Sequence, residues 1–509
     1  MKKLQLIILL LACTKMSMGQ LLLTGNIKGS VKGDSVEVNL SYDGNYWAKN
    51  SVYLKTDVAG KFHTAYPYHT PKFIMLIYKS AKQYLLLSPG RPLYVSINNS
   101  ASPIFAFAGK AKPENDLIQK LNLEVTELPF VKELKVKNSY ATWPVDSVVQ
   151  YKVPAIMHSL DSTQKLVNQS NLPASTKKII ATEVRYEYAD AVSVNVGSWL
   201  NNRKNRANFN LHFIDTVLKK FGLPTKNELD GSLYANLYLN EYFRFKSWKG
   251  IYTYNANPDK VKANEILKAS TGIDYDDLLN EIKKDGNEEY AFTTRITAAA
   301  PQYAWEKQLT NLMFNFCMSS QLQSADKLLY FIKGNLTNEQ YIAAAEKMFI
   351  PLKKERDQYA HNLNIRIRPD YKSISSLKEL MAPYKGKVVL VDMWYTQCPP
   401  CIAELAYDQP LKARFKDKDV IFLNIALEED KDDEIWRDFI LINNIPAEHV
   451  RRTRNQMGPL WNELGVIDSQ QKYPTYIIFD REGKVAVKDA SRPSEREALY
   501  SQIENVLNK

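Results

Sequence analysis

An apolar run that leads directly into two cysteines constrains this chain more than any other feature. The segment Val388 to Trp394 is apolar apart from Asp392, and Cys398-Pro399-Pro400-Cys401 follows after three residues. A continuous apolar run of this length is typical of a strand that is buried on both faces. Proline suits the first positions of a helix, where the N–H that it lacks would have no partner. We therefore predict a buried strand, a short loop and a helix whose first turn holds both cysteines.

The two-residue spacing of the cysteines indicates redox chemistry. Two sulfurs in one helical turn can close and reopen a disulfide. The partial positive charge of the helix N-terminus stabilises a thiolate at Cys398 and lowers its pKa. We therefore predict that Cys398 is the attacking sulfur and that Cys401, which should lie deeper, resolves the mixed disulfide. Such a cycle needs no bound cofactor.

Other interpretations of the cysteine pair fit the sequence less well. Half of a zinc site would need two more ligands, but only Cys317 and six scattered histidines remain beside Cys13. No metal site is therefore predicted. Cys317 lies in an apolar helical stretch, which favours a buried, inert thiol over a third redox centre. A peroxidase motif, Pro-x-x-x-Thr-x-x-Cys, is excluded because Val391 and Tyr395 stand at the matching positions. A purely structural disulfide is the remaining alternative.

The alternation of apolar runs and helical patterns predicts three domains behind an N-terminal segment. Residues 20–112 read as short strands of a small antiparallel, β-sandwich-like domain, and residues 113–361 read as a helical domain. Residues 362–509 alternate strands with helices, which indicates a parallel sheet with an antiparallel edge after Gly483. The fold class is therefore multidomain, with α+β and α/β parts. Expected strands of the last domain are 365–367, 388–394, 420–426, 475–479 and 485–488, and its expected helices are 399–415, 433–443 and 494–507.

Proline positions in the helical region suggest where its helices begin. The region is punctuated by Pro113, Pro154, Pro173, Pro224, Pro258, Pro301 and Pro351. Since proline disrupts a helix interior, we expect each of them near a helix start or in a loop.

The first 19 residues resemble a targeting segment. Lys2 and Lys3 precede an apolar stretch, and small residues precede a cut at Gln20, which is the pattern of a secretory signal peptide. The alternative is a lipoprotein signal that leaves Cys13 as a lipid anchor. Both place the mature chain outside the cytoplasm. The formal net charge of +11 comes without a basic block interleaved with aromatics, so no nucleic-acid partner is predicted.

Residues 385–485 resemble the thioredoxin superfamily, and most closely the TlpA/ResA-like periplasmic thiol-disulfide oxidoreductases. The resemblance rests on Trp394, on Cys398-Pro399-Pro400-Cys401, on Tyr473-Pro474-Thr475 and on the hairpin from Phe479 to Lys484. Two positions depart from the family pattern, because Gln397 replaces a tryptophan and Ala406 replaces a frequent proline. These changes concern the rim of the substrate surface rather than the exchange chemistry.

The resemblance and the local chemistry together assign further site residues. Asp392 on an apolar strand should be desolvated, which raises its pKa and suits it to exchange a proton with Cys401. Glu404, one turn after Cys401, stands where the family commonly has a glutamate near the buried sulfur. The family's substrate surface implies Trp394, Pro399, Tyr473 and Pro474, with Pro474 in a cis peptide facing the disulfide.

The predicted function is exchange of thiols and disulfides in substrate proteins in the periplasm, with the chain acting as a reductase. Such a protein must be recharged in an oxidising compartment, which implies an electron-transfer partner in the membrane. The alternative is a binding or chaperone-like envelope protein in which the redox domain is subsidiary.

Overall fold

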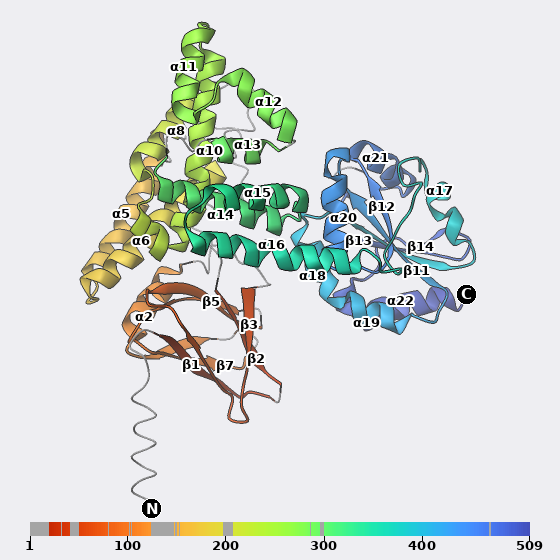
Figure 1. The fold of residues 1–509 in the computed structure, drawn as a ribbon. Helices are drawn as coiled ribbons and strands as arrows, with labels where there is room; N and C mark the ends of the chain where they lie inside the picture. The colour runs from red at the N-terminus through yellow and green to blue at the C-terminus, as the bar shows by residue number, and fades with distance from the viewer. Residues whose placement is uncertain are drawn as a thin grey trace, which may run out of the picture. The chain divides into compact units, whose positions relative to one another are not determined.

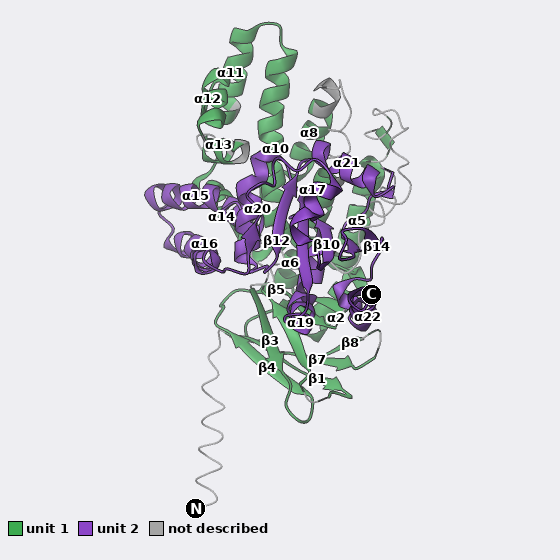
Figure 2. Cartoon of the chain, turned by 90° about the vertical axis from the view of Figure 1, so that its right-hand side faces the viewer, with its two compact units in different colours: residues 1–311 green, residues 312–509 purple. Residues whose placement is uncertain are grey.

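The computed structural model describes residues 20–509 except 32, 41–49, 80, 101, 103, 124–146, 148–149, 152, 197–206, 286, 296–299 and 468–469. The predicted signal segment, including Cys13, therefore lies outside the described residues. The chain divides into two compact units, residues 1–311 and 312–509 (Figure 2). No helix among the described residues is both long and apolar enough to cross a bilayer.

The N-terminal unit begins with two four-stranded sheets that face each other across one apolar core (Figure 1). One sheet has the order β4-β1-β7-β8 and the other β3-β2-β5-β6. The sandwich prediction is thus confirmed, but β1 pairs with β7 in parallel, so the expectation of an entirely antiparallel arrangement was wrong. The strands are β1 (Leu21–Lys28), β2 (Ser35–Asn39), β3 (Ser51–Lys55), β4 (Lys61–Tyr66), β5 (Lys72–Tyr78), β6 (Ala81–Leu87), β7 (Leu93–Asn98) and β8 (Phe105–Gly109).

The sheet that contains β5 and β6 is buried on both faces. Along β5, Ile74 and Leu76 pack into the core between the sheets, whereas Phe73 and Met75 pack into a second core formed with helices. The strand and helical regions of this unit therefore share a core. The helices are α2 (Lys112–Leu121), α5 (Val153–Gln169), α6 (Ala174–Ala191), α8 (Ala207–Phe221), α9 (Lys226–Gly231), α10 (Leu233–Ala256), α11 (Lys260–Thr271), α12 (Tyr275–Asp285) and α13 (Glu288–Arg295).

Helix α14 (Gln302–Met318) spans the division between the units, and α15 (Leu322–Asn335) and α16 (Glu339–Tyr359) belong to the C-terminal one. Six of the seven prolines lie at or just before a helix start, as the sequence predicts. Pro351 is the exception, because it lies inside α16. The domain boundary predicted at 361/362 stays a prediction.

The C-terminal unit is built on a six-stranded sheet of order β14-β13-β10-β11-β12-β9. The strands β9, β12, β11 and β10 run parallel, and β14 pairs antiparallel with β13 across the hairpin predicted at Gly483. β13 also pairs antiparallel with β10, which the sequence did not predict. Helices lie on both sides of the sheet, so β10 is buried on both faces (Figure 1). The strands are β9 (Arg366–Ile367), β10 (Val388–Trp394), β11 (Val420–Leu427), β12 (Glu448–Arg452), β13 (Thr475–Phe479) and β14 (Val485–Val487).

The helix predicted over 399–415 is broken. It consists of α18 (Pro399–Glu404), a 3-10 turn (Leu405–Tyr407) and α19 (Asp408–Arg414). The break has a local cause, since Pro410 has no N–H to donate to a carbonyl one turn earlier. The other helices of the domain are α17 (Leu377–Met381), α20 (Asp433–Ile442), α21 (Arg454–Glu463) and α22 (Glu497–Leu507).

Candidate active site

The two cysteines of the motif form a disulfide at the start of α18. Cys398 is the N-cap of this helix, and its Sγ accepts the backbone N–H of Cys401 at 3.2 Å. Pro399 and Pro400 occupy the first helical positions and are exposed. Cys398 is 0% exposed and Cys401 is 4% exposed. The expectation that Cys401 lies deeper is therefore not met, and the order of attack stays a prediction based on the helix N-terminus.

Aromatic side chains surround the disulfide. Trp394 and both cysteines belong to one apolar cluster, in which the Trp394 ring packs on Phe439 with centroids 5.5 Å apart. Trp394 is 3% exposed, and among the described residues its indole N–H has no hydrogen-bond partner. Its predicted contact with substrate stays a prediction, and in this structure the ring packs inside the apolar cluster.

The loop before β13 brings Tyr473 and Pro474 to the same cluster. The peptide bond between them is cis. The Tyr473 hydroxyl accepts the Trp461 indole N–H at 3.2 Å, and its ring meets Tyr395 edge-on at 5.5 Å. The half-buried Tyr473 and Tyr395 thus lie next to the disulfide cluster, where a bound polypeptide could contact them.

Asp392 lies on the face of β10 that is covered by α19 and α22. Its carboxyl Oδ1 is shut off from solvent, and no donor in the described part of the chain bonds to it. Burial raises the pKa of Asp392 well above its ordinary value, and the nearby Asp408 carboxylate raises it further, while the Lys412 ammonium opposes both effects. Lys412 Nζ is itself paired with Asp408 Oδ2 at 2.6 Å. Asp392 is therefore an acid whose neutral form is favoured by its surroundings.

Glu404 is also buried, but its carboxylate is already occupied. Its two oxygens accept the backbone N–H of Ser494 at 2.8 Å and the Ser494 hydroxyl at 2.9 Å. These bonds tie α18 to the segment that leads into α22. Glu404 is 7% exposed. It lies on the same short helix as Cys401, and its place near the buried sulfur stays a prediction.

A groove of about 450 Å³ opens beside the aromatic pair. Its walls are Tyr395, Leu427, Glu428, Glu429, Asp432, Arg454 and Tyr473. The Glu428 carboxylate accepts the backbone N–H of Thr396 at 2.6 Å, two residues before Cys398. Burial raises the pKa of Glu428, although this hydrogen bond works in the opposite direction. Glu428 thus joins the end of β11 to the loop that carries the disulfide.

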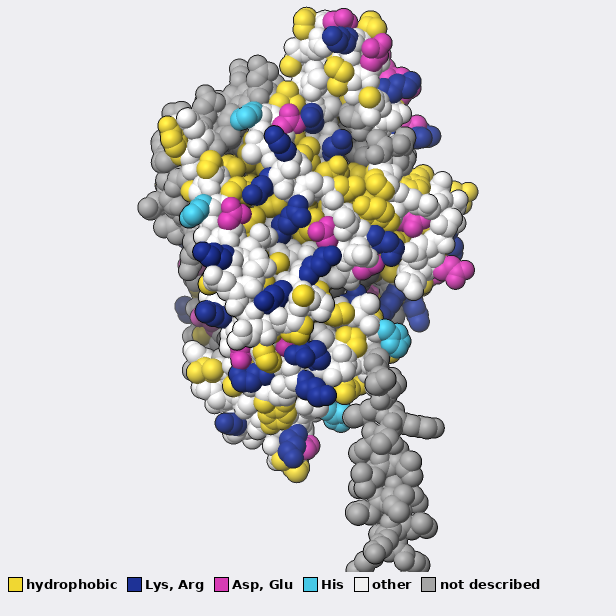
Figure 3. Space-filling view, turned by 90° about the vertical axis from the view of Figure 1, so that its left-hand side faces the viewer, with side chains coloured by type: hydrophobic (Ala, Val, Ile, Leu, Met, Phe, Trp, Pro, Cys, Tyr) yellow, Lys and Arg dark blue, Asp and Glu magenta, His cyan; other side chains and the backbone are white. Residues whose placement is uncertain are grey.

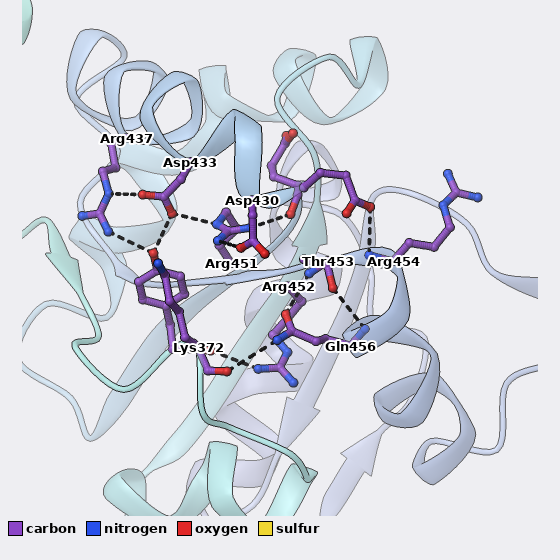
Figure 4. Close-up of polar contacts among 12 residues, drawn as sticks. Lys372, Asp430, Asp433, Arg437, Arg451, Arg452, Thr453, Arg454 and Gln456 are labelled. Carbon is purple, nitrogen blue, oxygen red and sulfur yellow. Dashed lines mark hydrogen bonds and ion pairs between the residues drawn. The ribbon is translucent and has the colours of Figure 1, made fainter. Parts of the chain in front are cut away.

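An arginine network holds the segment after β11, from which Glu428, Glu429 and Asp432 line this groove (Figure 4). Arg451, on β12, is 2% exposed and donates to the Glu428 carbonyl at 2.9 Å and to Asp433 Oδ1 at 2.7 Å. Arg437 donates to Asp433 Oδ2 at 2.8 Å and to the Tyr371 hydroxyl at 3.2 Å. Each arginine offers several donors in a fixed plane, which suits it to fix the 428–433 segment.

Comparison with known proteins agrees with this geometry. A model of the Redoxin family matches residues 366–507. The C-terminal domain is a Redoxin domain.

The chain is also similar to curated and solved relatives over about a quarter of its length. Thiol-disulfide oxidoreductase ResA of Bacillus thuringiensis subsp. konkukian is 29% identical over 126 residues, which are 25% of this chain and 65% of the relative. A ResA of Bacillus cereus is 28% identical over 131 residues, covering 25% and 64%. The chain thus spans about 65% of the length of these relatives.

Two solved structures align with a similar share of the chain. The thioredoxin domain of a thiol-disulfide oxidoreductase from Bacteroides vulgatus is 25% identical and covers 25% of this chain and 84% of its own, with a TM-score of 0.22. StoA from Bacillus subtilis is 21% identical and covers 23% and 86%, with a TM-score of 0.19.

Several residues around the disulfide of the Redoxin domain escape prediction from sequence. These are Glu428, Arg451, Lys412, Asp408 and Ser494. A signal existed for Glu428, because it lies two residues after a predicted strand, and the carboxyl ends of parallel strands meet at one edge of the sheet. Ser494 carries no such signal. Within the described residues, no group of three or more His, Cys, Asp or Glu side chains could hold a metal ion.

The third described cysteine lies in α14, outside the Redoxin domain, and is expected to be unreactive. Cys317 is 4% exposed and contacts the Met313 sulfur at 3.8 Å. Burial raises the pKa of its thiol to about 12, and a thiol reacts as its thiolate. In the reduced native protein, we expect a thiol reagent to modify Cys398 and Cys401 and to reach Cys317 only after denaturation. Rapid labelling of Cys317, identified by peptide mapping, would contradict this.

Proposed function

We propose that the chain is a thiol-disulfide oxidoreductase that acts on protein substrates through a dithiol–disulfide cycle of Cys398 and Cys401. The observation that carries this is the disulfide at the first turn of α18, next to the Tyr473–Pro474 loop and inside a Redoxin domain. The ResA relatives support the same activity by name. The test is reduction of insulin disulfides by the full-length mature protein with a thiol donor.

The proposed step in the reducing direction begins with the thiolate of Cys398. It attacks a substrate disulfide, so that one substrate sulfur leaves as a thiolate and the other is held in a mixed disulfide. Cys401 then loses its proton to Asp392 and attacks Cys398, which releases the second substrate sulfur. Two electrons pass to the substrate, and the enzyme ends as the observed Cys398–Cys401 disulfide.

The groove that Tyr395 and Tyr473 line is proposed to receive the substrate segment. Both side chains also pack against the cluster that holds the disulfide, and Pro399 between the two cysteines is exposed. An extended segment could pair with the backbone near Tyr473. The acid Glu428 is proposed to keep the loop that carries Cys398 in position while the segment binds.

The direction of electron flow is proposed to be reductive. A strong oxidant needs its thiolate form stabilised by donors or positive charge. Among the described residues, Cys398 Sγ accepts a hydrogen bond from the Cys401 N–H, and the residues between the cysteines are two prolines. Lys412 is paired with Asp408. The thiolate of Cys398 should therefore be stabilised only moderately, by the helix end.

This argument predicts a low reduction potential. Equilibration of the mature protein with glutathione, followed by mass spectrometry of the Cys398–Cys401 peptide, should give a potential well below about −120 mV, the value of a strong periplasmic oxidant. A potential near that value would reverse the proposed direction and make the protein a disulfide donor. The Cys317→Ser variant is the matched control, because it should have the potential of the wild type.

The proposed location is the periplasm, as a soluble or a lipid-anchored protein. The motivation is the signal pattern before Gln20 and the alternative anchor at Cys13. Reducing power in that compartment has to be supplied by a membrane electron-transfer partner that delivers two electrons and two protons per turnover. No nucleic-acid partner is proposed.

A further inference from the structure

The helical part of the N-terminal unit holds a second hollow, of about 430 Å³, that the redox chemistry does not use. It is formed by α5, α6 and the start of α9. Its walls include the polar side chains of Gln164, Asn168 and Thr182. This volume lies within the range of about 300–1,000 Å³ that is common for small-molecule sites.

Three cations line this hollow, and two of them are held in place. Lys177 Nζ donates to the Asn168 carbonyl at 2.8 Å. The Arg185 guanidinium donates to the Phe221 carbonyl at 2.7 Å and lies over the Tyr186 ring, 5.3 Å from its centroid. Lys178 is exposed at the rim. Holding the cations before a ligand arrives lowers the entropy cost of binding it.

The acid that lines the hollow, Glu228, is already occupied. Its Oε2 accepts the backbone N–H of Thr225 at 2.8 Å, the Thr225 hydroxyl at 2.9 Å and the Tyr186 hydroxyl at 3.1 Å. Its Oε1 is 3.7 Å from Arg185 Nη1. Glu228 thus serves to cap α9 and to orient Arg185. Three cations and one acid leave the lining with a net charge of +2.

The wider surface is also positively charged. The face of the molecule drawn in Figure 3 gathers many Lys and Arg side chains, with fewer acidic ones between them. Among the described residues, Lys165 on α5 follows the lining residue Gln164 in the chain and is exposed. A surface of one sign draws counter-ions toward the hollow and raises their local concentration.

We propose that the hollow between α5, α6 and α9 binds a small ligand that carries phosphate. A phosphate monoester has a charge of about −1.5 to −2 at neutral pH, which matches the lining, whereas a single carboxylate would leave the hollow positive. The planar guanidinium of Arg185 can bind two phosphate oxygens at once, and Lys177 and Lys178 supply point charges beside it. The site is separate from the disulfide and does not depend on the function proposed for it.

The test is calorimetric titration of the mature full-length protein with pyrophosphate. We expect binding with a dissociation constant below about 1 mM. The K178E variant replaces an exposed side chain, so it should fold, and charge reversal there should weaken binding by about tenfold or more. Arg185→Lys keeps the charge but loses the planar fork, and it should also weaken binding. The matched control K219E lies on α8 outside the lining and should bind pyrophosphate within about twofold of the wild type.

A second arm separates a free ligand from a lipid headgroup. Vesicles of phosphatidylcholine with and without phosphatidylglycerol are sedimented with the same variants. Retention that requires phosphatidylglycerol, is lost in K178E and is competed by pyrophosphate supports the site and assigns its phosphate to a lipid. Pyrophosphate binding without retention supports a soluble ligand. No pyrophosphate binding by the wild type, or equal weakening in K178E and K219E, overturns the proposal.

Discussion

Replacing Cys398 with serine should abolish disulfide exchange, with the rate of insulin reduction falling by more than about 1,000-fold. The serine hydroxyl cannot form a disulfide, and it is not ionised near neutral pH, so the first step of the cycle is lost. The position of Cys398 as the N-cap of α18 carries this expectation, because the helix end stabilises a thiolate there. The rate is measured by the turbidity of precipitating insulin chains.

Cys401→Ser should behave differently. Cys398 can still attack, but the mixed disulfide has no resolving thiol, so adducts with substrate proteins should accumulate and be visible on non-reducing gels. Cys317→Ser is the matched control and should leave the rate unchanged. If Cys401→Ser were inactive without adducts while Cys398→Ser trapped them, the two sulfurs would have to exchange roles.

The central strands of the Redoxin domain could be predicted because they are continuous apolar runs. β10 and β13 have the predicted limits, and β11 extends one residue beyond its prediction. A strand buried on both faces needs no alternation of polar and apolar residues, so its own composition identifies it. The same reasoning missed β12, whose residues Glu448–Arg452 are mostly polar. Its burial depends on Asp430 and Asp433, which meet Arg451 only in the folded chain.

The residues of the candidate site also divide into those that local spacing predicts and those that only the folded chain brings together. Asp392, Cys398 and Cys401 lie within ten residues of one another, so local spacing sufficed to nominate them, and their roles stay predictions. Glu428 reaches Thr396 from 32 residues away, and that contact depends on the pairing of β10 with β11. Lys412 and Asp408 influence the pKa of Asp392 from α19, a helix that begins after a break that the sequence did not predict.

In the N-terminal unit, the sequence indicated strands and helices but not the core that they share. The run Phe73 to Tyr78 is apolar on both faces of β5. Such a run predicts that something covers each face, yet it does not identify the partners. One face is covered by the other sheet and the other face by helices that lie much later in the chain, and only the tertiary structure shows this.

Asp392→Asn should slow the resolving step by about 100-fold near neutral pH, the lower end of what a positioned general base contributes. The amide cannot accept the proton of Cys401, whereas the first attack by Cys398 should change much less. The difference should shrink above about pH 9, where Cys401 ionises without help. Stopped-flow measurement of both steps between about pH 6 and pH 9 checks this, and resolution rates equal to wild type across that range would exclude the role of Asp392.

Asp392→Asn should also change how the free energy of unfolding depends on pH. Burial holds the pKa of Asp392 well above its unfolded value of about 3.9. Between these two values the folded state binds more protons than the unfolded state, so the contribution of Asp392 to stability falls as pH rises through that window. Asp392→Asn removes this loss. The free energy of unfolding of the variant relative to the wild type should therefore rise as the pH increases above about 4. Urea unfolding of the oxidised proteins measures it, and Asp417→Asn, at an exposed acid, is the control that should show no such rise. A relative stability that is independent of pH would mean that Asp392 ionises in the folded protein as easily as in the unfolded chain, and its role as a proton carrier near neutral pH would then be untenable.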